Sequence, residues 1–308
     1  MSQGTTVPTG RFAPSPSGRM HMGNLWSCLL SWLSARSAGG RMVLRLEDLD
    51  PDRCRREYCD QVMRDLEWLG LDWDGEPVYQ SRRTEAYAEA FRSLEAQGLI
   101  YPCYCTRAER LAASAPHRSD GLQVYDGRCS RLTEERRREL EQTRRPAWRV
   151  KVPEKSIAFC DLLQGKYCED LKKDCGDFIV RRSDGVYAYQ LAVVVDDAMM
   201  GVTQVVRGSD LLSSTPRQLW LQEALGLPHP EYGHLPLLLS PEGRRLAKRD
   251  RDLELGELQS RYTAWEIVGR LAYAARLIDR PQPITPRELV PLFDWKKLPR
   301  EDLVWELR

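Results

Sequence analysis

The stretch that decides the fold is R-F-A-P-S-P-S-G-R-M-H-M-G-N, residues 11–24. Residues 9–12 are apolar enough to end a short strand, and the prolines and glycine that follow cannot continue it. From Asn24 to Ser37 the apolar residues repeat at helical spacing. The sequence therefore predicts a strand, a turn and a helix that begins near His21 and Gly23, where orphan N–H groups and the positive dipole end favour an anion such as phosphate.

A second strand is predicted at Arg41–Leu46, which alternates and is rich in strand formers. A strand, a helix and a strand in this order predict a parallel sheet, whose ligands bind beyond the carboxyl ends of the strands. Arg11 and Glu47 both lie at such ends. An arginine matches a carboxylate and a carboxylate matches an ammonium group, so the pair indicates a site for a zwitterion. The alternative is a solvated turn in which Glu47, Asp48 and Asp50 cap the next helix.

The second half of the sheet is predicted from two apolar runs. Val186–Val195 is interpreted as a buried parallel strand that ends at Asp196 and Asp197, and residues 202–207 as another short strand. Tyr189 and Arg207 would then emerge near the same crevice. A core tyrosine and a surface arginine are the structural alternatives.

A cysteine cluster predicts a metal site. Nine cysteines are an odd count without a secretion signal, which argues against a disulfide framework. Cys103, Cys105 and Cys129 have a spacing that suits tetrahedral zinc, which needs one further ligand. Chemistry alone favours His117, the only histidine in that loop, because imidazole is a common zinc ligand. Three reduced thiols without metal are the alternative. The other six cysteines are interpreted as packing residues: Cys28, Cys54, Cys59, Cys160, Cys168 and Cys175.

Composition is typical of a soluble, cytoplasmic enzyme. The 308 residues are 42% hydrophobic, enough for a large core, and the formal net charge is only +1. No run approaches the length of a membrane span, and the N-terminus lacks a targeting pattern. We therefore expect no membrane association, and we expect a monomer. Arginines crowd residues 107–145, but glutamates interleave with them, so RNA contact and a solvated helix face both remain open.

Three motifs in collinear order resemble those of the class I glutamyl-tRNA synthetases: R-F-A-P-S-P-S-G-x-x-H-x-G from Arg11, R-x-E-D-x-D from Arg45 and G-x-R-L-A-K-R from Gly243. The resemblance implies an α/β fold, namely a Rossmann-type class I aminoacyl-tRNA synthetase catalytic domain with a zinc-containing insertion and a small C-terminal helical region. The implied divisions are residues 1–83 (first catalytic half), 84–186 (inserted acceptor-binding lobe with the zinc site), 187–249 (second catalytic half with a KMSKS-like loop) and 250–308 (helical, similar to a stem-contact region, without an anticodon-binding domain).

The same resemblance implies roles for individual residues. Glutamate would be held by Arg11, Phe12, Ala13, Pro14, Ser15, Glu47, Tyr189 and Arg207. ATP, with Mg²⁺, would contact His21, Gly23, Asn24 and Lys248, of which His21, Gly23 and Lys248 are the catalytic residues.

Two further implications concern the metal site and the basic loop. The fourth zinc ligand would be Tyr125 in the pattern C-x-C…Y-x-x-x-C, with His117 as its competitor. The basic loop departs from the family because Arg245 replaces a lysine and Ala247 replaces a serine, which removes one hydroxyl donor to phosphate.

The segment 250–308 has room for a few helices rather than a second large domain. This favours shortened paralogues within the family, which activate L-glutamate with ATP and transfer it to queuosine in the anticodon of tRNA(Asp). The expected partners are therefore L-glutamate, ATP and tRNA(Asp) bearing queuosine. Two other functions stay open: a truncated glutamyl-tRNA synthetase that charges the tRNA 3′ end, and a non-catalytic RNA-binding paralogue.

Overall fold

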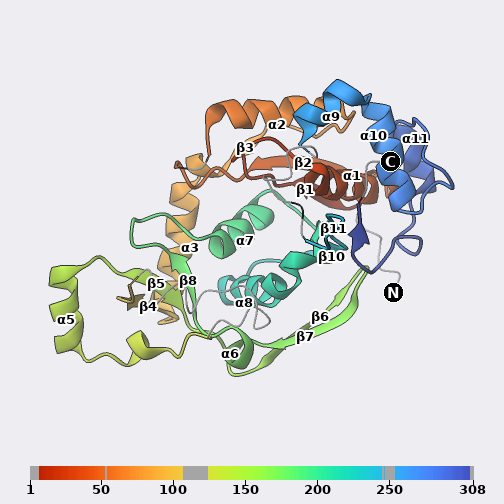
Figure 1. Cartoon of the computed structure of the whole chain (residues 1–308). Helices are drawn as coiled ribbons and strands as arrows, with labels where there is room; N and C mark the ends of the chain where they lie inside the picture. The colour runs from red at the N-terminus through yellow and green to blue at the C-terminus, as the bar shows by residue number, and fades with distance from the viewer. Residues whose placement is uncertain (1–6, 53, 107–123, 245, 247–253, 306–308) are drawn as a thin grey trace.

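The centre of the molecule is built from parallel strands (Figure 1). The computed structural model describes residues 7–52, 54–106, 124–244, 246 and 254–305. The parallel strands at this centre pair as β1-β2-β3 and as β9-β10. Their bounds are β1 Thr9–Phe12, β2 Arg41–Leu46, β3 Val78–Tyr79, β9 Gln204–Gly208 and β10 Glu231–Leu235. The Thr203 N–H donates to the Thr9 carbonyl over 3.0 Å, which places β9 beside β1.

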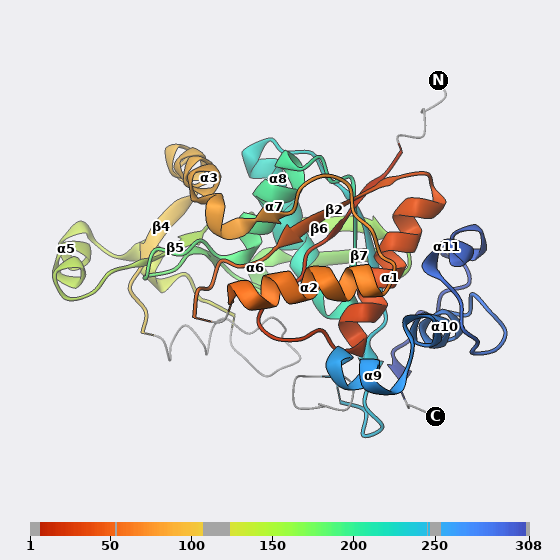
Figure 2. The same cartoon turned by 90° about the horizontal axis from the view of Figure 1, so that it is seen from above.

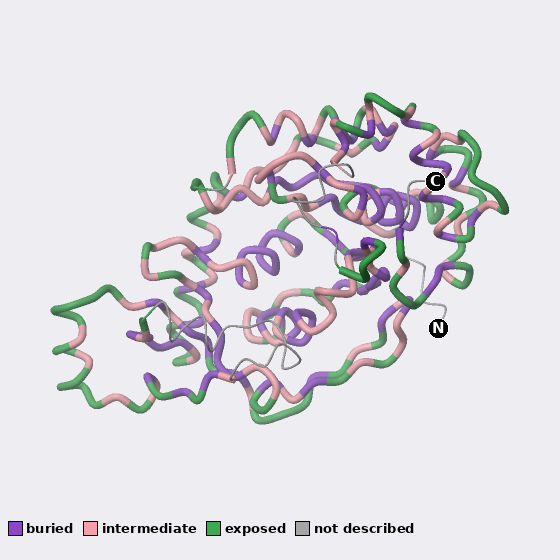
Figure 3. The backbone as a smooth tube through the Cα atoms, in the orientation of Figure 1, coloured by how far each residue is buried: buried purple, intermediate pink, exposed green. Residues whose placement is uncertain are grey.

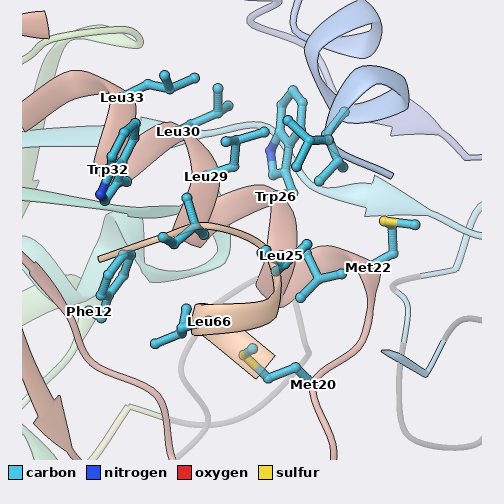
Figure 4. Close-up of a cluster of buried hydrophobic side chains, with 14 of the residues drawn as sticks. Phe12, Met20, Met22, Leu25, Trp26, Leu29, Leu30, Trp32, Leu33 and Leu66 are labelled. Carbon is cyan, nitrogen blue, oxygen red and sulfur yellow. The ribbon is translucent and has the colours of Figure 1, made fainter. Parts of the chain in front are cut away.

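The predicted strand–helix–strand unit is confirmed. Helix α1 (Met22–Ser37) connects β1 to β2, and the two strands pair in parallel from Thr9 with Arg41 to Phe12 with Leu44. Figure 4 shows why the helix forms here: its apolar side chains face Phe12 and, from helix α2 (Arg56–Trp68), Leu66. The apolar repeat seen in the sequence is thus the face that buries α1 against the sheet.

The prediction of a buried strand at Val186–Val195 is wrong. The segment forms helix α7 (Tyr189–Met199), and Asp196 and Asp197 lie inside it rather than ending it. Every residue from Leu191 to Asp197 is buried, so the helix has no polar face to reveal its period. A short apolar run without periodicity does not distinguish a buried strand from a buried helix.

An insertion projects from the sheet and carries its own small sheet (Figures 1 and 2). Strands β4 (Ile100–Cys103), β5 (Ala147–Val150) and β8 (Phe178–Arg181) pair antiparallel in the order β4-β5-β8. Helices α3 (Thr84–Ala96) and α5 (Glu134–Thr143) lie in the same segment of the chain. Helix α5 has no buried residue and is pink and green in Figure 3, so the solvated-face interpretation fits its described contacts.

A hairpin within residues 84–186, which the sequence did not reveal, contacts the central strand β10. Strands β6 (Ser156–Asp161) and β7 (Gly165–Asp170) pair antiparallel, and the Leu162 N–H donates to the Tyr232 carbonyl over 2.8 Å. Cys160 and Cys168 lie on the exposed face of this hairpin. Their interpretation as packing residues is therefore wrong, because the hairpin gives each strand one solvent-facing side.

The remaining elements are distributed around the central strands, the hairpin and the insertion (Figure 1). They are α6 Leu171–Asp174, α8 Thr215–Leu225, β11 Leu238–Leu239, β12 Leu303–Val304, α9 Leu255–Arg261, α10 Ala264–Ala274, α11 Pro286–Leu289 and the 3₁₀ turns Gln80–Arg82, Arg128–Arg131, Ser209–Ser214 and Val290–Leu292. Helix α10 buries Ile267, Val268, Leu271 and Ala272, whereas Trp265 is 39% exposed. Within the described ranges, no helix is both long and apolar enough to cross a membrane.

Candidate functional site

A cavity of about 540 Å³ opens where β1, β2 and β9 end. Every described residue that the sequence analysis assigned to glutamate or ATP lines it, namely Arg11, Phe12, Ala13, Pro14, Ser15, His21, Gly23, Asn24, Glu47, Tyr189 and Arg207. Lys248, Arg245 and Ala247 lie outside the described residues. Residues far apart in the sequence thus meet at one place, as expected for the carboxyl ends of parallel strands.

Arg11 enters the cavity from the end of β1. Its side chain is 5% exposed, and its Nη1 donates to the Val206 carbonyl on β9 over 3.0 Å. Burial lowers the pKa of Arg11, and the carboxylate of Asp197, with Oδ1 at 3.8 Å from Nε, acts in the opposite direction. Backbone and carboxylate together hold the guanidinium at the cavity wall.

Behind Arg11 lies a buried cluster of charges that sequence reasoning missed. Arg45 is fully buried on β2, and its guanidinium donates to Asp197 over 2.6 Å and to Glu47 over 3.2 Å. Burial alone would lower the pKa of Arg45, but Asp197, Glu47 and Asp196 outweigh it and raise that pKa. Asp196 and Asp197 reach Arg45 because the segment that carries them folds as helix α7. The sequence of β2 alone therefore does not predict this cluster.

Glu47 faces the cavity under two opposing influences. Burial raises the pKa of its carboxyl, while Arg45 and Arg11 act to lower it. The Glu47 N–H donates to the Pro14 carbonyl over 3.0 Å, which ties the end of β2 to the proline-containing turn after β1. A carboxylate so placed beside an arginine can accept from an ammonium group.

Tyr189 and Arg207 complete the wall from α7 and β9. Burial raises the pKa of the Tyr189 phenol. Arg207 is 4% exposed, its Nη2 donates to Thr215 Oγ1 over 2.8 Å, and its Nε donates to His234 Nε2 over 3.1 Å. Among the described residues its buried Nη1 has no hydrogen-bond partner. A buried donor without a partner is costly, and a ligand carboxylate in the cavity would satisfy it.

His21 is the N-cap of α1. Its Nδ1 accepts from the Gly23 N–H over 3.2 Å, and Asn24 Oδ1 accepts from the His21 N–H over 3.0 Å. The predicted helix start is confirmed, but the Gly23 N–H is already satisfied by the cap. A Cβ on Gly23 would lie 3.1 Å from Cε1 and 3.2 Å from Nδ1 of the His21 ring. Glycine at this position therefore avoids a close contact with that ring.

The cysteine cluster lies in the insertion, away from the cavity. The Sγ atoms of Cys103, Cys105 and Cys129 are all within 4.8 Å of one another, and Cys105 and Cys129 are 3.7 Å apart. Four ligands at about 2.3 Å from zinc would stand about 3.8 Å apart at the corners of a tetrahedron. The cluster therefore has the separations that a metal site requires.

Tyr125 and Arg149 adjoin these thiols. Tyr125 Oη lies 3.8 Å from Cys103 Sγ and accepts from the Cys129 N–H over 3.0 Å. Arg149 is 1% exposed, its Nε donates to Cys103 Sγ over 3.3 Å, and its guanidinium stacks 3.7 Å from the centre of the Tyr125 ring. The Cys129 thiol, followed by Arg149, lowers the pKa of Cys103 to about 4. His117 lies outside the described residues.

The chain matches known proteins over most of its length. The family model described as the catalytic domain of tRNA synthetases class I (E and Q) matches residues 7–275. A glutamyl-Q tRNA(Asp) synthetase of Symbiobacterium thermophilum is 51% identical over 305 residues, which cover 95% of this chain and 94% of that protein. The protein of the same name from Nitratidesulfovibrio vulgaris is 50% identical, with 96% and 94% covered.

Solved structures agree with this family. A glutamate tRNA ligase from Elizabethkingia meningosepticum, in complex with its amino acid, is 26% identical with a TM-score of 0.82 and covers 98% of this chain and 67% of that one. The glutamate-tRNA synthetase of Elizabethkingia anophelis gives a TM-score of 0.84 at 26% identity, with 98% and 68% covered. The chain therefore belongs to the class I tRNA synthetases for glutamate and glutamine, and within them to the glutamyl-Q tRNA(Asp) synthetase family.

Proposed function

We propose that this chain activates L-glutamate with ATP and transfers it to queuosine in the anticodon of tRNA(Asp). The observation that carries the glutamate assignment is the cavity wall, where buried Arg11 and Arg207 approach from neighbouring strands and Glu47 lies at the end of a third. Two arginines and one carboxylate match an amino acid with two carboxylates and one ammonium group. The names of the relatives support the acceptor.

In the first step the α-carboxylate of glutamate attacks the α-phosphorus of ATP. A C–O–P linkage forms, the bond to the β-phosphate breaks, and glutamyl-adenylate and pyrophosphate result. We assign the triphosphate to His21, Gly23, Asn24 and Lys248, and the glutamate to Arg11, Phe12, Ala13, Pro14, Ser15, Glu47, Tyr189 and Arg207. Mg²⁺, when bound with ATP, neutralises phosphate charge. The protein's own contribution is positioning and charge stabilisation.

In the second step the glutamyl group passes to a hydroxyl of the queuosine cyclopentene ring, and AMP leaves. We assign the insertion, residues 84–186, to holding the anticodon stem-loop, because single-stranded loops present splayed bases and hydroxyls to a protein. The ion-paired arginines of α5, such as Arg136 with Glu139 at 2.6 Å and Arg138 with Glu134 at 3.3 Å, are exposed at its tip.

We also propose that Cys103, Cys105, Cys129 and Tyr125 bind one zinc ion. The separations of 3.7 Å and 3.8 Å within this set support a tetrahedral site, and the three thiols and a phenol provide four donors. The zinc, when bound, would brace an insertion whose own core around these residues is small. Arg149 would offset part of the negative charge of the ligands.

The activation step is tested by pyrophosphate exchange into ATP in the presence of single amino acids and the absence of tRNA. L-Glutamate should support exchange, whereas glutamine, which lacks the second carboxylate, should support at least about tenfold less. Lys248→Ala should lower the exchange rate more than it changes the glutamate KM, because its charge is directed at the phosphates. An absolute requirement for tRNA, or equal exchange with glutamine, would overturn the assignment.

A further inference from the structure

A buried chain of three side chains stands behind the unpaired nitrogen of Arg207. His234 lies on β10 directly opposite Arg207 on β9 and is fully buried. Its Nδ1 lies 2.6 Å from Asp161 Oδ2, and its Nε2 accepts from Arg207 Nε over 3.1 Å. Asp161 is the last residue of β6, so the chain leads from the hairpin to the cavity wall.

The hydrogen-bond partners fix the proton on the imidazole. Asp161 Oδ1 already accepts three backbone N–H groups, from Leu163 at 2.9 Å, Gln164 at 2.9 Å and His234 at 3.1 Å. The Asp161 Oδ2 atom is therefore left to accept the Nδ1–H of His234. A guanidinium nitrogen only donates, so the Nε2 that faces Arg207 must carry a lone pair and no proton. The Thr215 hydroxyl, 3.2 Å from the same Nε2, accepts from Arg207 Nη2 and can donate its own proton to this lone pair.

These contacts leave one direction for the guanidinium. Nε of Arg207 is held by His234, and Nη2 is held by Thr215 Oγ1 at 2.8 Å. The Arg207 Cζ atom, at the centre of the guanidinium group, also lies 5.4 Å from the centre of the Tyr232 ring. Among the described groups only Nη1 is left without a partner, at the wall of the cavity.

We propose that Asp161 and neutral His234 are positioning residues that orient Arg207 so that its Nη1 receives a carboxylate of glutamate. The inference rests on the proposed function for the identity of the ligand. Through Asp161, the β6–β7 hairpin would then contribute to the specificity for the amino acid, although no hairpin atom lines the cavity. A positioned donor binds the ligand without a further loss of side-chain freedom.

Two substitutions of one residue separate this role from a structural one. His234→Gln places an acceptor near the position of Nε2 and loses the bond to Asp161. His234→Asn places a donor near the position of Nδ1 and loses the acceptor for Arg207. A positioning role predicts that Gln retains more glutamate affinity than Asn, whereas a role in tying the hairpin to β10 predicts the reverse.

Asp161→Asn tests which nitrogen of the His234 ring must carry the proton. The three backbone donors keep the amide oxygen on their side, so the amide NH₂ faces His234 and its Nδ1 must accept. The imidazole proton then moves to Nε2, where it opposes Arg207 Nε–H and competes with Arg207 Nη2 for Thr215 Oγ1. Gln164→Ala is the matched control, because it removes the bond of the Gln164 amide to the His234 carbonyl at 3.0 Å and leaves the three-residue chain intact.

The experiment measures glutamate and ATP KM in pyrophosphate exchange, together with thermal unfolding of each variant. His234→Asn and Asp161→Asn should raise the glutamate KM about tenfold or more, as expected for a hydrogen bond to a charged group, and leave the ATP KM unchanged. His234→Gln should stay within about threefold of the wild type, and Gln164→Ala should match it. A glutamate KM for His234→Gln equal to or above that of His234→Asn would overturn the proposal.

A second readout does not depend on glutamate. In arginine-labelled protein the Nε–H signal of Arg207, identified by its loss in Arg207→Lys, should be protected from exchange in the wild type and His234→Gln but not in His234→Asn. If glutamate fails to support exchange and this pattern holds, the proposed function falls while the positioning role stands. If the signal is unprotected in the wild type, the positioning role falls.

Discussion

Arg45 Nη1 donates to Asp197 Oδ1 over 2.6 Å and joins β2 to α7 in the interior of the protein. The same carboxylate oxygen lies 3.8 Å from Nε of Arg11. Asp197 therefore stands between an arginine that faces the cavity and an arginine that does not reach it. The orientation of Arg11 depends on this buried charge as well as on its backbone contact with Val206.

Replacing Arg45 by Met should destabilise the protein by about 3–5 kcal/mol, because it leaves buried carboxylates without their partner. The free energy of unfolding in urea is the measurement. Arg83→Met is the matched control: Arg83 is 20% exposed, and the Asp196 it contacts keeps Tyr87 and Gln80 as donors. An equal decrease in the free energy of unfolding in the two variants would contradict this, because it would show that the contacts of Arg45 stabilise the protein no more than those of Arg83.

Stability should fall as the pH drops through about 6.5, and His234 should account for part of the loss. Burial is the main cause of the lowered pKa of His234, with Arg207 and Arg11 acting in the same direction, Asp161 opposing them and Tyr232 stacked alongside. The unfolded chain then binds a proton at a pH where the folded chain does not, so the free energy of unfolding decreases with falling pH. Urea unfolding from pH 8 to 5 should show a smaller decrease in His234→Gln, and identical slopes would contradict this.

Gly23→Ala should separate stability from activity. Alanine favours a helix over glycine, so unfolding should be unchanged or harder by up to about 1 kcal/mol. The added Cβ would stand 3.1 Å from the His21 ring, which must shift. We expect a raised ATP KM with an unchanged glutamate KM in pyrophosphate exchange. A lowered melting temperature would contradict this separation, because it would show that the shift of the His21 ring also disrupts the N-cap of α1.

Elemental analysis of untagged protein should find about one zinc per chain. Cys129→Ser should lower the occupancy, and Cys160→Ser, on an exposed strand face, should not. Tyr125→Phe should weaken metal binding, while Tyr104→Phe, whose hydroxyl donates to Glu141, should leave it unchanged. Full zinc retained after joint replacement of Cys103 and Cys105 would rule out the site.

Periodic and motif-bearing segments of the sequence predicted their structures well. The sequence predicts strand, helix and strand over residues 9–46 because apolar residues recur at helical spacing from Leu25 to Leu33 and a turn with two prolines and a glycine precedes them, although α1 is buried on most of its sides. The position of Arg11 and Glu47 at the carboxyl ends of two parallel strands also predicts that the two side chains share a cavity. These inferences use local spacing and the geometry of parallel sheets alone.

What failed depends on contacts that local spacing does not encode. Residues Leu191–Asp197 of helix α7 are all buried, so the apolar run predicts a strand as readily as a helix, and it gives no indication of the partners of Asp196 and Asp197. The sequence also gives no indication of the β6–β7 hairpin or of Asp161 at its end. The proposed role of Asp161 depends on a contact with His234, which is 73 residues away in the chain. The role of a buried charged residue depends on the residue it pairs with, and the tertiary fold determines that pairing.

The most direct test of the central claim is to charge tRNA(Asp) with labelled glutamate after its 3′-terminal nucleotide has been removed. The account predicts that tRNA bearing queuosine is still labelled, that tRNA lacking queuosine is not, and that nuclease digestion places the label in the anticodon loop. Labelling that disappears with the terminal nucleotide, and that falls on the terminal adenosine of intact tRNA, would contradict it.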